Sequence, residues 1–448
     1  MKVTFVRPCI GRPEPGKFEK GAIEPLTLAV LGALTPPDVD VEMYDDRVEP
    51  VPFDRPTDLA AITTESFTAA RAYQIAAEYR RRGVPTVAGG MHASLLPAEV
   101  ARHFDAVVVG DAELVWAQVL ADARRGKLKK RYKGAPQTPQ SADGAQDAGA
   151  GSLLPRRDLF AGKRYLPVSL VQFSRGCPHA CTFCAPAVYF NRRQVFRRID
   201  DVVREIAEQR LKTILFVDDN LTANRSAAAE LFREITPLKV RWASQGGLDM
   251  AEDPAFMDLM MKSGCAGHLV GVESMEPATL AAMGKVKNLD VDYARRFEVF
   301  RDFGMQLWAA LTIGHDTDTA DSIARLCDWA IERKFAFAAF NLLMPYPATP
   351  FYKQLTREKR HLFDGRWWDH PDYRYNHAAY VPARMTADEL TSACFDAWAR
   401  FYSWPAIARR SLDFKTHLSH PFKFGLFALY NYVFHREMFL MQDMKLGE

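Results

Sequence analysis

The chain has 448 residues, enough for two or three domains with substantial cores. Hydrophobic residues make up 48% of the sequence and charged residues 25%, which is ordinary for a soluble globular protein. Lysine and arginine (58) nearly balance aspartate and glutamate (55), so the net charge of +3 gives no reason to expect nucleic-acid binding. No apolar run approaches the roughly 18 residues of a membrane span, and the first six residues have a strand pattern, not that of a signal peptide. We therefore expect a cytoplasmic protein without a transmembrane segment.

The first 135 residues alternate between strand-like and helix-like patterns. Strand-like runs cover residues 3–6, 39–44, 59–63, 84–88 and 106–110. Helical spacing of apolar residues occurs at 26–34, at 69–82 and from 113 onward. This alternation predicts a doubly wound parallel sheet, in which ligands lie at the carboxyl ends of the strands.

Three of those strand ends carry hydroxyl, glycine or acidic residues. Such residues suit a large polar ligand that lies close to the backbone. The first end has Thr63, Thr64 and Ser66, the second has Gly89, Gly90, Met91 and His92, and the third has Gly110 and Glu113.

Residues 136–151 read PQTPQSADGAQDAGAG, a composition typical of a flexible connector. We therefore divide the chain into a first domain at 1–135, a linker at 136–160, a second domain at 161–355 and a C-terminal domain at 356–448. Within the linker, Arg156 and Arg157 are expected in a solvated turn.

A strand-like run at 168–173 leads directly into Cys177, Cys181 and Cys184, a CxxxCxxC spacing. Three thiolates can hold three irons of a [4Fe–4S] cluster and leave the fourth iron open to a small molecule. Structural zinc is the alternative, with His179 as a fourth ligand, but zinc usually takes two separated ligand pairs. The remaining cysteines are scattered, so no disulfide framework is indicated.

Five further strand-like runs follow, at 213–217, 240–243, 269–272, 307–313 and 336–343, with helical patterns between them. Six βα units predict a partial (β/α)₆ barrel, whose chemistry lies at the carboxyl ends of the strands. Two adjacent carboxylates, Asp218 and Asp219, follow the second of these strands and can accept from an ammonium group, or one of them can cap the next helix.

The cysteine loop resembles that of the radical S-adenosylmethionine (SAM) enzymes. The run VAGGMHASLLPAEV, followed by DAVVVGDAE, resembles the cobalamin-binding domain that precedes many radical SAM cores. The likeness extends from about residue 59 to about residue 410. One departure is the absence of the DxHxxG motif, whose histidine ligates cobalt from below, after the first strand.

This resemblance implies that SAM binds the open iron and is split to a 5′-deoxyadenosyl radical by an electron from a flavodoxin- or ferredoxin-type donor. It implies SAM contacts from Asp218, Asp219, Gln245, Glu273 and Ser274. It implies cobalamin contacts from Thr63, Thr64, Ser66, Gly89, Gly90, Met91, His92, Gly110 and Glu113, although His92 is expected to be a polar loop residue and not a cobalt ligand.

No catalytic residue is assigned, but Gln245 and Tyr346 are candidates to face the substrate, with structural roles as the alternative. Tyr346 precedes Pro347-Ala348-Thr349, where relatives often have Pro-Gly-Thr, so this turn is expected to keep its shape with less backbone freedom. Aromatic residues at 366–380 resemble a small C-terminal domain that closes part of the active site. Residues 421–441 form either an amphipathic helix that touches a membrane or lipid-like substrate, or a helix packed on the barrel.

Three hypotheses about function follow. The first is a cobalamin-dependent radical SAM methyltransferase that methylates an unactivated carbon of a natural-product or lipid-like small molecule. The second keeps the radical chemistry for cyclisation, rearrangement or carbon–carbon coupling, with the first domain as a scaffold. The third is a zinc- or cluster-stabilised binding protein without catalysis.

Overall fold

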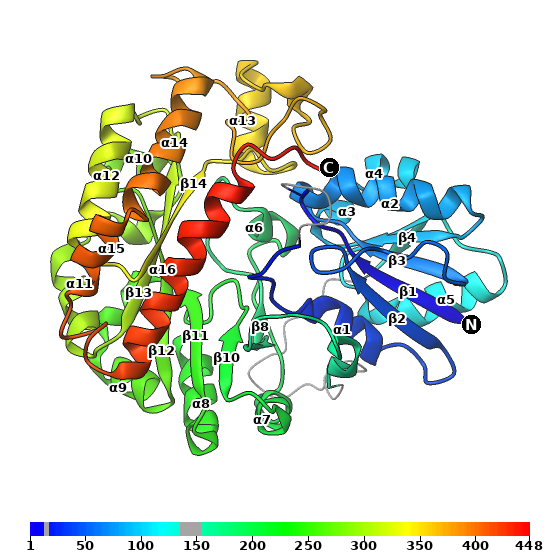
Figure 1. The fold of residues 1–448 in the computed structure, drawn as a ribbon, viewed down its shortest axis with the longest axis horizontal. Helices are drawn as coiled ribbons and strands as arrows, with labels where there is room; N and C mark the ends of the chain where they lie inside the picture. Colours follow the sequence, from blue (N-terminus) through cyan, green and yellow to red (C-terminus); the bar gives the residue numbers. More distant parts are fainter. Residues whose placement is uncertain (13–17, 135–153) are drawn as a thin grey trace.

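The computed structural model describes residues 1–12, 18–134 and 154–448, with the side chains of 437–440 excepted. Two parallel α/β units lie beside each other, the N-terminal one in blue and cyan and the other in green to red (Figure 1). This is the predicted fold class. The connector predicted at 136–151 lies outside the described residues, so the domain boundaries remain predictions there.

The N-terminal unit is a six-stranded parallel sheet in the order β2-β1-β3-β4-β5-β6. Its strands are β1 (Lys2–Arg7), β2 (Asp40–Asp45), β3 (Leu59–Thr63), β4 (Thr86–Gly89), β5 (Ala106–Val109) and β6 (Arg131–Lys133). Five of them match predicted runs, whereas β6 was not predicted. All five residues of β3 are buried, because helices cover both faces of the sheet.

Apolar residues divide into one core on each face of this sheet. Helices α1 (Leu26–Ala33) and α5 (Trp116–Arg124) contribute Leu28 and Trp116 to the core that contains Phe5. Helices α2 (Ala69–Arg81) and α4 (Pro97–His103) supply Ile75 and Val100 to the other core, which continues into the second unit. The short helix α3 (Met91–Leu95) follows β4 at the carboxyl edge.

The second unit is a six-stranded parallel sheet in the sequential order β7-β10-β11-β12-β13-β14, as a partial (β/α)₆ barrel requires. Its strands are β7 (Ser169–Val171), β10 (Thr213–Phe216), β11 (Arg241–Gly246), β12 (Cys265–Glu273), β13 (Gln306–Ile313) and β14 (Phe337–Leu342). The intervening helices are α7 (Ile199–Glu208), α8 (Arg225–Ile235), α9 (Pro254–Lys262), α10 (Pro277–Ala282), α11 (Tyr293–Asp302) and α12 (Ala320–Glu332).

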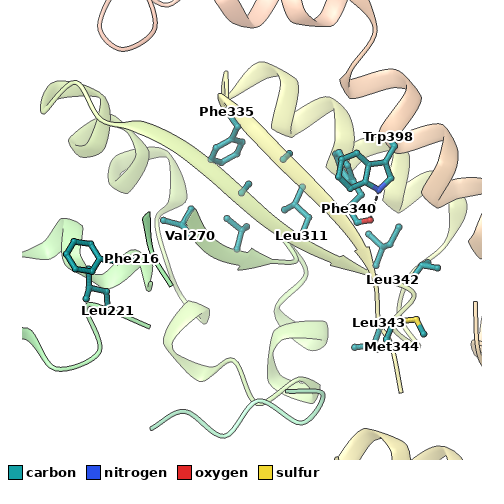
Figure 2. Close-up of a cluster of buried hydrophobic side chains, with 14 of the residues drawn as sticks. Phe216, Leu221, Val270, Leu311, Phe335, Phe340, Leu342, Leu343, Met344 and Trp398 are labelled. Carbon is teal, nitrogen blue, oxygen red and sulfur yellow. Dashed lines mark hydrogen bonds between the residues drawn. The ribbon is translucent and has the colours of Figure 1, made fainter. Parts of the chain in front are cut away.

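Helix α14 (Ala387–Phe401) packs against the outer side of β14 (Figure 2). Leu311, Phe340 and Trp398 are almost fully buried in this layer. The indole nitrogen of Trp398 donates a hydrogen bond to the Phe340 carbonyl oxygen at 2.9 Å, which fixes the helix to the strand. Helix α14 therefore packs into the barrel core, and the predicted C-terminal domain at 356–448 stays a prediction.

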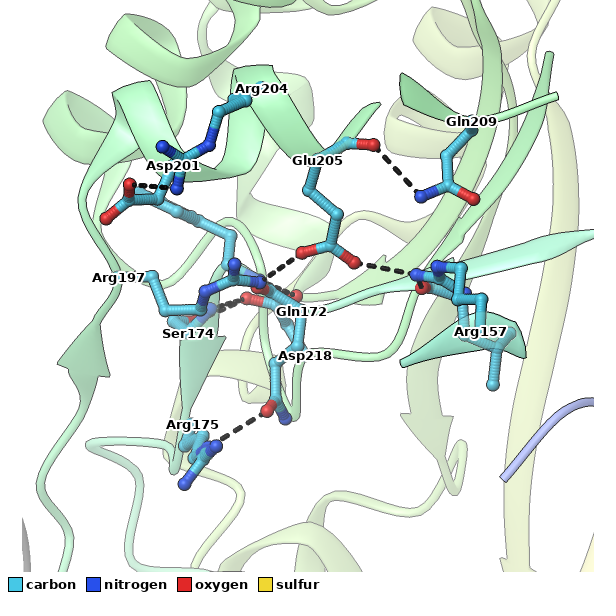
Figure 3. Close-up of polar contacts among 12 residues, drawn as sticks. Arg157, Gln172, Ser174, Arg175, Arg197, Asp201, Arg204, Glu205, Gln209 and Asp218 are labelled. Atoms are coloured by element: carbon cyan, nitrogen blue, oxygen red, sulfur yellow. Dashed lines mark hydrogen bonds and ion pairs between the residues drawn. The ribbon is translucent and has the colours of Figure 1, made fainter. Parts of the chain in front are cut away.

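The segment that enters the barrel is held by a buried carboxylate (Figure 3). Glu205 accepts from Arg157 at 2.6 Å and from Arg197 at 2.7 Å, and its side chain is 1% exposed. The expectation of a solvated turn at Arg157 is therefore wrong, because this side chain is needed to neutralise Glu205. Arg156 pairs only with the exposed Asp158.

After α13 (Pro350–Glu358), the chain returns to the N-terminal unit, where Trp368 donates to Glu99 at 2.8 Å. Helices α15 (Trp404–Ser411) and α16 (Pro421–Met441) follow α14, and α16 lies across the barrel strands (Figure 1). Of the two alternatives for 421–441, the structure has the helix packed on the barrel. None of the described helices combines the length and apolarity needed to cross a membrane.

Candidate active site

The cysteine loop lies between β8 (Ser174–Arg175) and α6 (Ala185–Tyr189), above the carboxyl end of β7. Its backbone is held from several sides. The Gly176 amide donates to the Asp219 carboxylate at 2.7 Å, and the Thr182 amide donates to the Met283 carbonyl oxygen at 2.9 Å. The Thr182 carbonyl oxygen in turn accepts from the Phe351 amide at 3.0 Å.

Cys177, Cys181 and Cys184 all line one cavity of about 480 Å³ at the carboxyl ends of the barrel strands. All three are free thiols. Burial raises the pKa of Cys181, and it raises the pKa of Cys184 to about 12. A cationic metal centre would be needed to keep these buried groups as thiolates, so the thiol set fits an iron–sulfur cluster. Within the described residues, no three Cys, His, Asp or Glu side chains form a group suited to a single metal ion.

Glu273 and Lys285 form an ion pair in the wall of the same cavity. The Lys285 ammonium lies 2.8 Å from one oxygen of Glu273, and the Thr312 hydroxyl donates to the other oxygen at 2.7 Å. Burial acts to lower the pKa of Lys285, but the Glu273 carboxylate outweighs it and the pKa is raised. The lysine is therefore charged and holds Glu273 in place.

The backbone around this ion pair is shaped to make room for it. Glu273 has a φ of 66°, a conformation that costs energy for a residue with a Cβ and is often found at functional sites. A Cβ at Gly271 would lie 2.6 Å from the Lys285 ammonium nitrogen, so a larger residue there would push the end of this side chain aside.

The two adjacent carboxylates after β10 have different surroundings. Asp219 lines the cavity, whereas Asp218 is fully buried behind it. Asp218 accepts from the Ser174 hydroxyl at 2.6 Å and from the Phe173 amide at 3.0 Å (Figure 3). Burial raises the pKa of Asp218 to about 7. Its carboxylate orders the strand before the cysteines and does not reach the cavity.

The other predicted SAM contacts also separate into two groups. Gln245 lines the cavity and donates to the Asp218 carbonyl oxygen at 2.9 Å. Ser274 is buried, and its hydroxyl accepts from the Glu276 amide at 3.1 Å. The structure therefore brings Asp219, Gln245 and Glu273 to one cavity with the cysteines, and it does not bring Asp218 or Ser274 there.

A second cavity, of about 310 Å³, lies at the carboxyl ends of β3, β4 and β5. The Thr63 hydroxyl oxygen is buried and has no hydrogen-bond partner among the described residues. Gly90 has a φ of 111°, and a Cβ there would lie 2.8 Å from the Thr64 carbonyl oxygen. An unpartnered hydroxyl beside a glycine cradle fits a bound polar cofactor. Of the predicted cobalamin contacts, this cavity is lined by Thr63, Gly89, Gly90, Met91, Gly110 and Glu113.

Thr64, Ser66 and His92 lie behind this cavity and do not line it. His92 is fully buried, with one ring nitrogen 3.1 Å from the Ser66 hydroxyl and the other 3.2 Å from the Tyr73 hydroxyl. Both nitrogens are therefore occupied by protein groups, so the inclusion of His92 among the cofactor contacts is not supported by its position.

Arg175 connects the two units and lines the N-terminal cavity. Its guanidinium lies 2.5 Å from Glu113 and 3.3 Å from Asp111 of the N-terminal unit, and Asp111 also accepts from Tyr189 at 2.9 Å. Asp219 lines both cavities. The two sites are thus neighbours across the interface between the units.

Tyr346 packs in an aromatic cluster between the two units. Its ring centroid lies 6.2 Å from that of Phe67 and 5.9 Å from that of Trp367. Tyr346 is not among the residues that line either cavity. Its packing matches the structural alternative for this residue.

Sequence reasoning missed Lys285 and Arg175, although both hold charged partners at the site. Lys285 comes more than a hundred residues after the cysteines, and no spacing rule relates them. Arg175 lies two residues before Cys177, so its position beside the thiols was visible, but its acidic partners could be found only from the fold.

Residues 171–330 match the family model of the radical SAM superfamily, so the chain contains a radical SAM domain. A radical SAM domain implies a [4Fe–4S] cluster, held by the cysteine loop, and SAM. The resemblance stated from the cysteine motif is confirmed.

Among curated proteins, the chain is 27% identical over 401 residues to bacteriochlorophyllide d C-12(1)-methyltransferase of Chlorobaculum tepidum, covering 88% of this chain and 86% of the relative. It is 21% identical to the anaerobic magnesium-protoporphyrin IX monomethyl ester cyclase of Cereibacter sphaeroides, covering 78% of this chain and 60% of that protein.

Two solved structures share the fold. The cobalamin-dependent SAM radical enzyme OxsB, solved with aqua-cobalamin bound, matches with a TM-score of 0.62 at 15% identity, covering 97% of this chain and 72% of OxsB. The radical SAM methyltransferase TsrM of Kitasatospora setae matches with a TM-score of 0.59 at 18% identity, covering 80% and 77%. The two-unit architecture is therefore that of known radical SAM proteins.

Proposed function

We propose that this chain is a cobalamin-dependent radical SAM methyltransferase that transfers a methyl group to an unactivated carbon of a small molecule. The observation that carries the proposal is the shared wall at Asp219, which places the cysteine-lined cavity next to the cavity of the N-terminal unit. A methyl donor and a hydrogen-abstracting radical must both reach one substrate carbon, and adjacent cavities meet that need.

When bound, the cluster with SAM supplies a radical that removes a hydrogen atom, and cobalamin supplies the methyl group that replaces it. Cys177, Cys181 and Cys184 would ligate the cluster. Contacts to cobalamin would come from the residues that line the N-terminal cavity, which are Thr63, Gly89, Gly90, Met91, Gly110 and Glu113.

SAM would be held by Asp219, Gln245 and Glu273, the predicted contacts that share the cavity with the cysteines. A carboxylate has about four acceptor positions, and Glu273 uses two of them for Lys285 and Thr312. The remaining positions can accept from the ammonium or ribose groups of SAM. The Lys285 ammonium holds this carboxylate in place, so it positions an acceptor and does not need to touch SAM itself.

The substrate class is inferred from the curated relatives. The name of one relative gives bacteriochlorophyllide d, a small organic molecule, as the group that is methylated. We infer a small molecule with a large apolar skeleton for this chain, and a flavodoxin- or ferredoxin-type protein as the electron donor.

Radical cyclisation without methyl transfer is the second candidate function. The similarity of the chain to a magnesium-protoporphyrin cyclase supports it. The two candidates differ in the fate of the SAM methyl group. With trideuteromethyl-SAM, methyl transfer gives a product heavier by the labelled methyl group, whereas cyclisation gives an unlabelled product.

The first experiment is anaerobic purification, reconstitution with iron and sulfide, addition of hydroxocobalamin, and an absorbance spectrum after desalting. The matched control is the triple variant Cys177→Ala, Cys181→Ala, Cys184→Ala. Retained corrin bands, with a cluster band that is lost in the triple variant, would support the proposal. A cluster without retained corrin would favour the second candidate, and no cluster in either protein would refute both.

A further inference from the structure

A third cavity, of about 330 Å³, lies inside the barrel between the strands and α16. Its wall consists almost entirely of apolar side chains, contributed by the barrel strands, by α16 and by the segments around Ile23 and Leu166. The volume lies within the range of small-molecule sites, which are mostly apolar with a few placed polar groups. An apolar space of this size is suited to an apolar guest and not to ordered water.

One end of this cavity adjoins the cysteine-lined cavity, and the other end lies away from it. Leu269, in the middle of β12, lines both this cavity and the cysteine-lined cavity. Arg241, the first residue of β11, lies at the opposite end. Leu269 pairs with Gln245, four residues along β11 from Arg241, so the two ends are about 13 Å apart.

Small residues keep the space between these ends open. Ala243 lies on the inner face of β11 between Arg241 and Gln245, and Ala266 lies at the start of β12. Larger side chains at these positions would fill the lumen, as is usual in closed barrels.

One polar group in the wall has no partner. Trp308 lines the cavity, and its indole nitrogen is buried without a hydrogen-bond partner among the described residues. Its ring is held by Tyr430 of α16, with centroids 5.1 Å apart. A buried donor of this kind costs free energy unless an acceptor is supplied, and the described residues supply none.

Arg241 is the one charged residue among the described residues that line the cavity. Its guanidinium lies 3.9 Å from the ring centroid of Phe422, and Arg241 forms no ion pair with a carboxylate within the described part of the chain. The neighbouring Lys423 does not line the cavity, and its ammonium donates to the Gly304 carbonyl oxygen at 2.6 Å. Arg241 alone therefore makes this entrance cationic, and aromatic stacking holds it there.

We propose that this lumen is a binding site for a single-chain anionic amphiphile, with its carboxylate or phosphate head at Arg241 and its aliphatic chain directed toward Leu269. The site is distinct from the cysteine-lined cavity and needs neither the cluster nor cobalamin. The proposal therefore stands or falls independently of methyl transfer.

The test is isothermal titration calorimetry on the anaerobically reconstituted enzyme with decanoate, decyl phosphate, decanol and acetate. We expect one equivalent of decanoate or decyl phosphate to bind, decanol to bind at least about tenfold more weakly, and acetate not to bind. The tighter of the two anions identifies the head group. The cluster-free triple cysteine variant should bind the same ligands with unchanged affinity, which separates this site from the proposed catalytic function.

Two variants locate the guest. Arg241→Gln should weaken decanoate or decyl phosphate by about tenfold and leave decanol unchanged. Ala243→Phe should fill the lumen and weaken all three decyl ligands by tenfold or more. Arg409→Gln, at an exposed position on α15, is the matched control and should change nothing. Absence of binding by both anions, or unchanged affinity in both lumen variants, would overturn the proposal.

Discussion

The guanidinium of Arg175 lies 2.5 Å from the carboxylate of Glu113, joining the strand before the cluster cysteines to the loop after β5 of the N-terminal unit. Burial alone would lower the pKa of Arg175, but Glu113 and Asp111 raise it. Arg175 is therefore charged within the interface between the two units. Its ion pairs fix the start of the cysteine loop against the acidic residues beside the N-terminal cavity.

Replacing Arg175 with methionine should leave Glu113 and Asp111 close together without their cation. We expect a loss of about 2 kcal/mol in stability and reduced corrin retention after desalting. Thermal unfolding followed by circular dichroism measures the first, and corrin absorbance the second. Arg198→Gln removes an exposed arginine whose partner Asp200 is also exposed, and it should have no effect on either.

Asp218 should make the enzyme less stable as the pH rises. Burial raises its pKa from 3.8 to about 7, so the folded protein binds a proton that the unfolded chain releases above pH 4. The resulting stabilisation is complete below about pH 4 and is lost as the pH rises through 7. The loss should amount to about 2–4 kcal/mol.

Asp218→Asn cannot titrate, so its unfolding midpoint should fall less between pH 5 and pH 8 than that of the wild type. The asparagine should nevertheless be less stable at pH 5, because its amide cannot accept all the hydrogen bonds of the carboxyl group. Asp200→Asn, at an exposed position, should follow the wild-type pH profile. If the unfolding midpoints of the wild type and Asp218→Asn changed equally with pH, Asp218 would not be the source of the pH dependence.

Lys285→Met should leave Glu273 buried, charged and unpaired beside the cysteines. We expect weaker SAM binding and at least a tenfold slower reductive cleavage of SAM, measured as 5′-deoxyadenosine release. Lys262→Met is the control, since Lys262 is exposed on α9, lies outside the cavity and pairs with Asp258 at 2.6 Å. If both variants cleaved SAM at the wild-type rate, Glu273 would not depend on Lys285.

Gly89 and Gly90 form a matched pair in the N-terminal cavity. Gly90→Ala forces an alanine to a φ of 111° and against the Thr64 carbonyl oxygen, so it should destabilise the protein by about 1–3 kcal/mol. Gly89→Ala meets no atom within 4 Å and should leave stability nearly unchanged. Because its methyl group would enter the cavity, it should still lower corrin retention. If a stably folded Gly89→Ala variant retained the corrin fully, the surface at Gly89 would not be in contact with the cofactor.

Ala348 occupies a left-handed position, with a φ of 67° in the turn before α13. Glycine would relieve about 1–2 kcal/mol of strain at this position, offset by about 0.5–1 kcal/mol of extra chain entropy in the unfolded state. Ala348→Gly should therefore raise stability by about 0.5–1 kcal/mol in thermal unfolding. Ala408→Gly, inside α15, should lower it by a similar amount. A lower thermal unfolding midpoint for Ala348→Gly would show that the left-handed backbone at Ala348 does not destabilise the folded protein.

The fold was predictable because both units repeat one pattern of apolar strand and amphipathic helix. The prediction failed at β6, whose three residues alternate exposed, buried and exposed, with Tyr132 as the only buried side chain. So short a strand has no sequence signature of its own, and it forms because the edge of β5 offers free hydrogen-bonding groups.

The site was predictable only in its local parts. The cysteine spacing is a property of one loop, and the strand ends that carry Asp219 and Glu273 follow from the barrel. Neighbours in sequence point in opposite directions at a strand end, so Thr63 lines a cavity whereas Thr64 does not. Partners such as Lys285 and Glu273 depend on how the loops after different strands fold back, which the pattern does not encode.

The hydrogen bonds of the cysteine loop determine when the metal centre can be assembled. Thr182 is held by Met283 and Phe351, which come from the fourth and sixth strand–loop units of the barrel. The three thiols therefore reach their positions only after most of the chain has been synthesised and the barrel has closed. We therefore expect cluster insertion to follow closure of the barrel, so that iron and sulfur are delivered to a folded apoprotein.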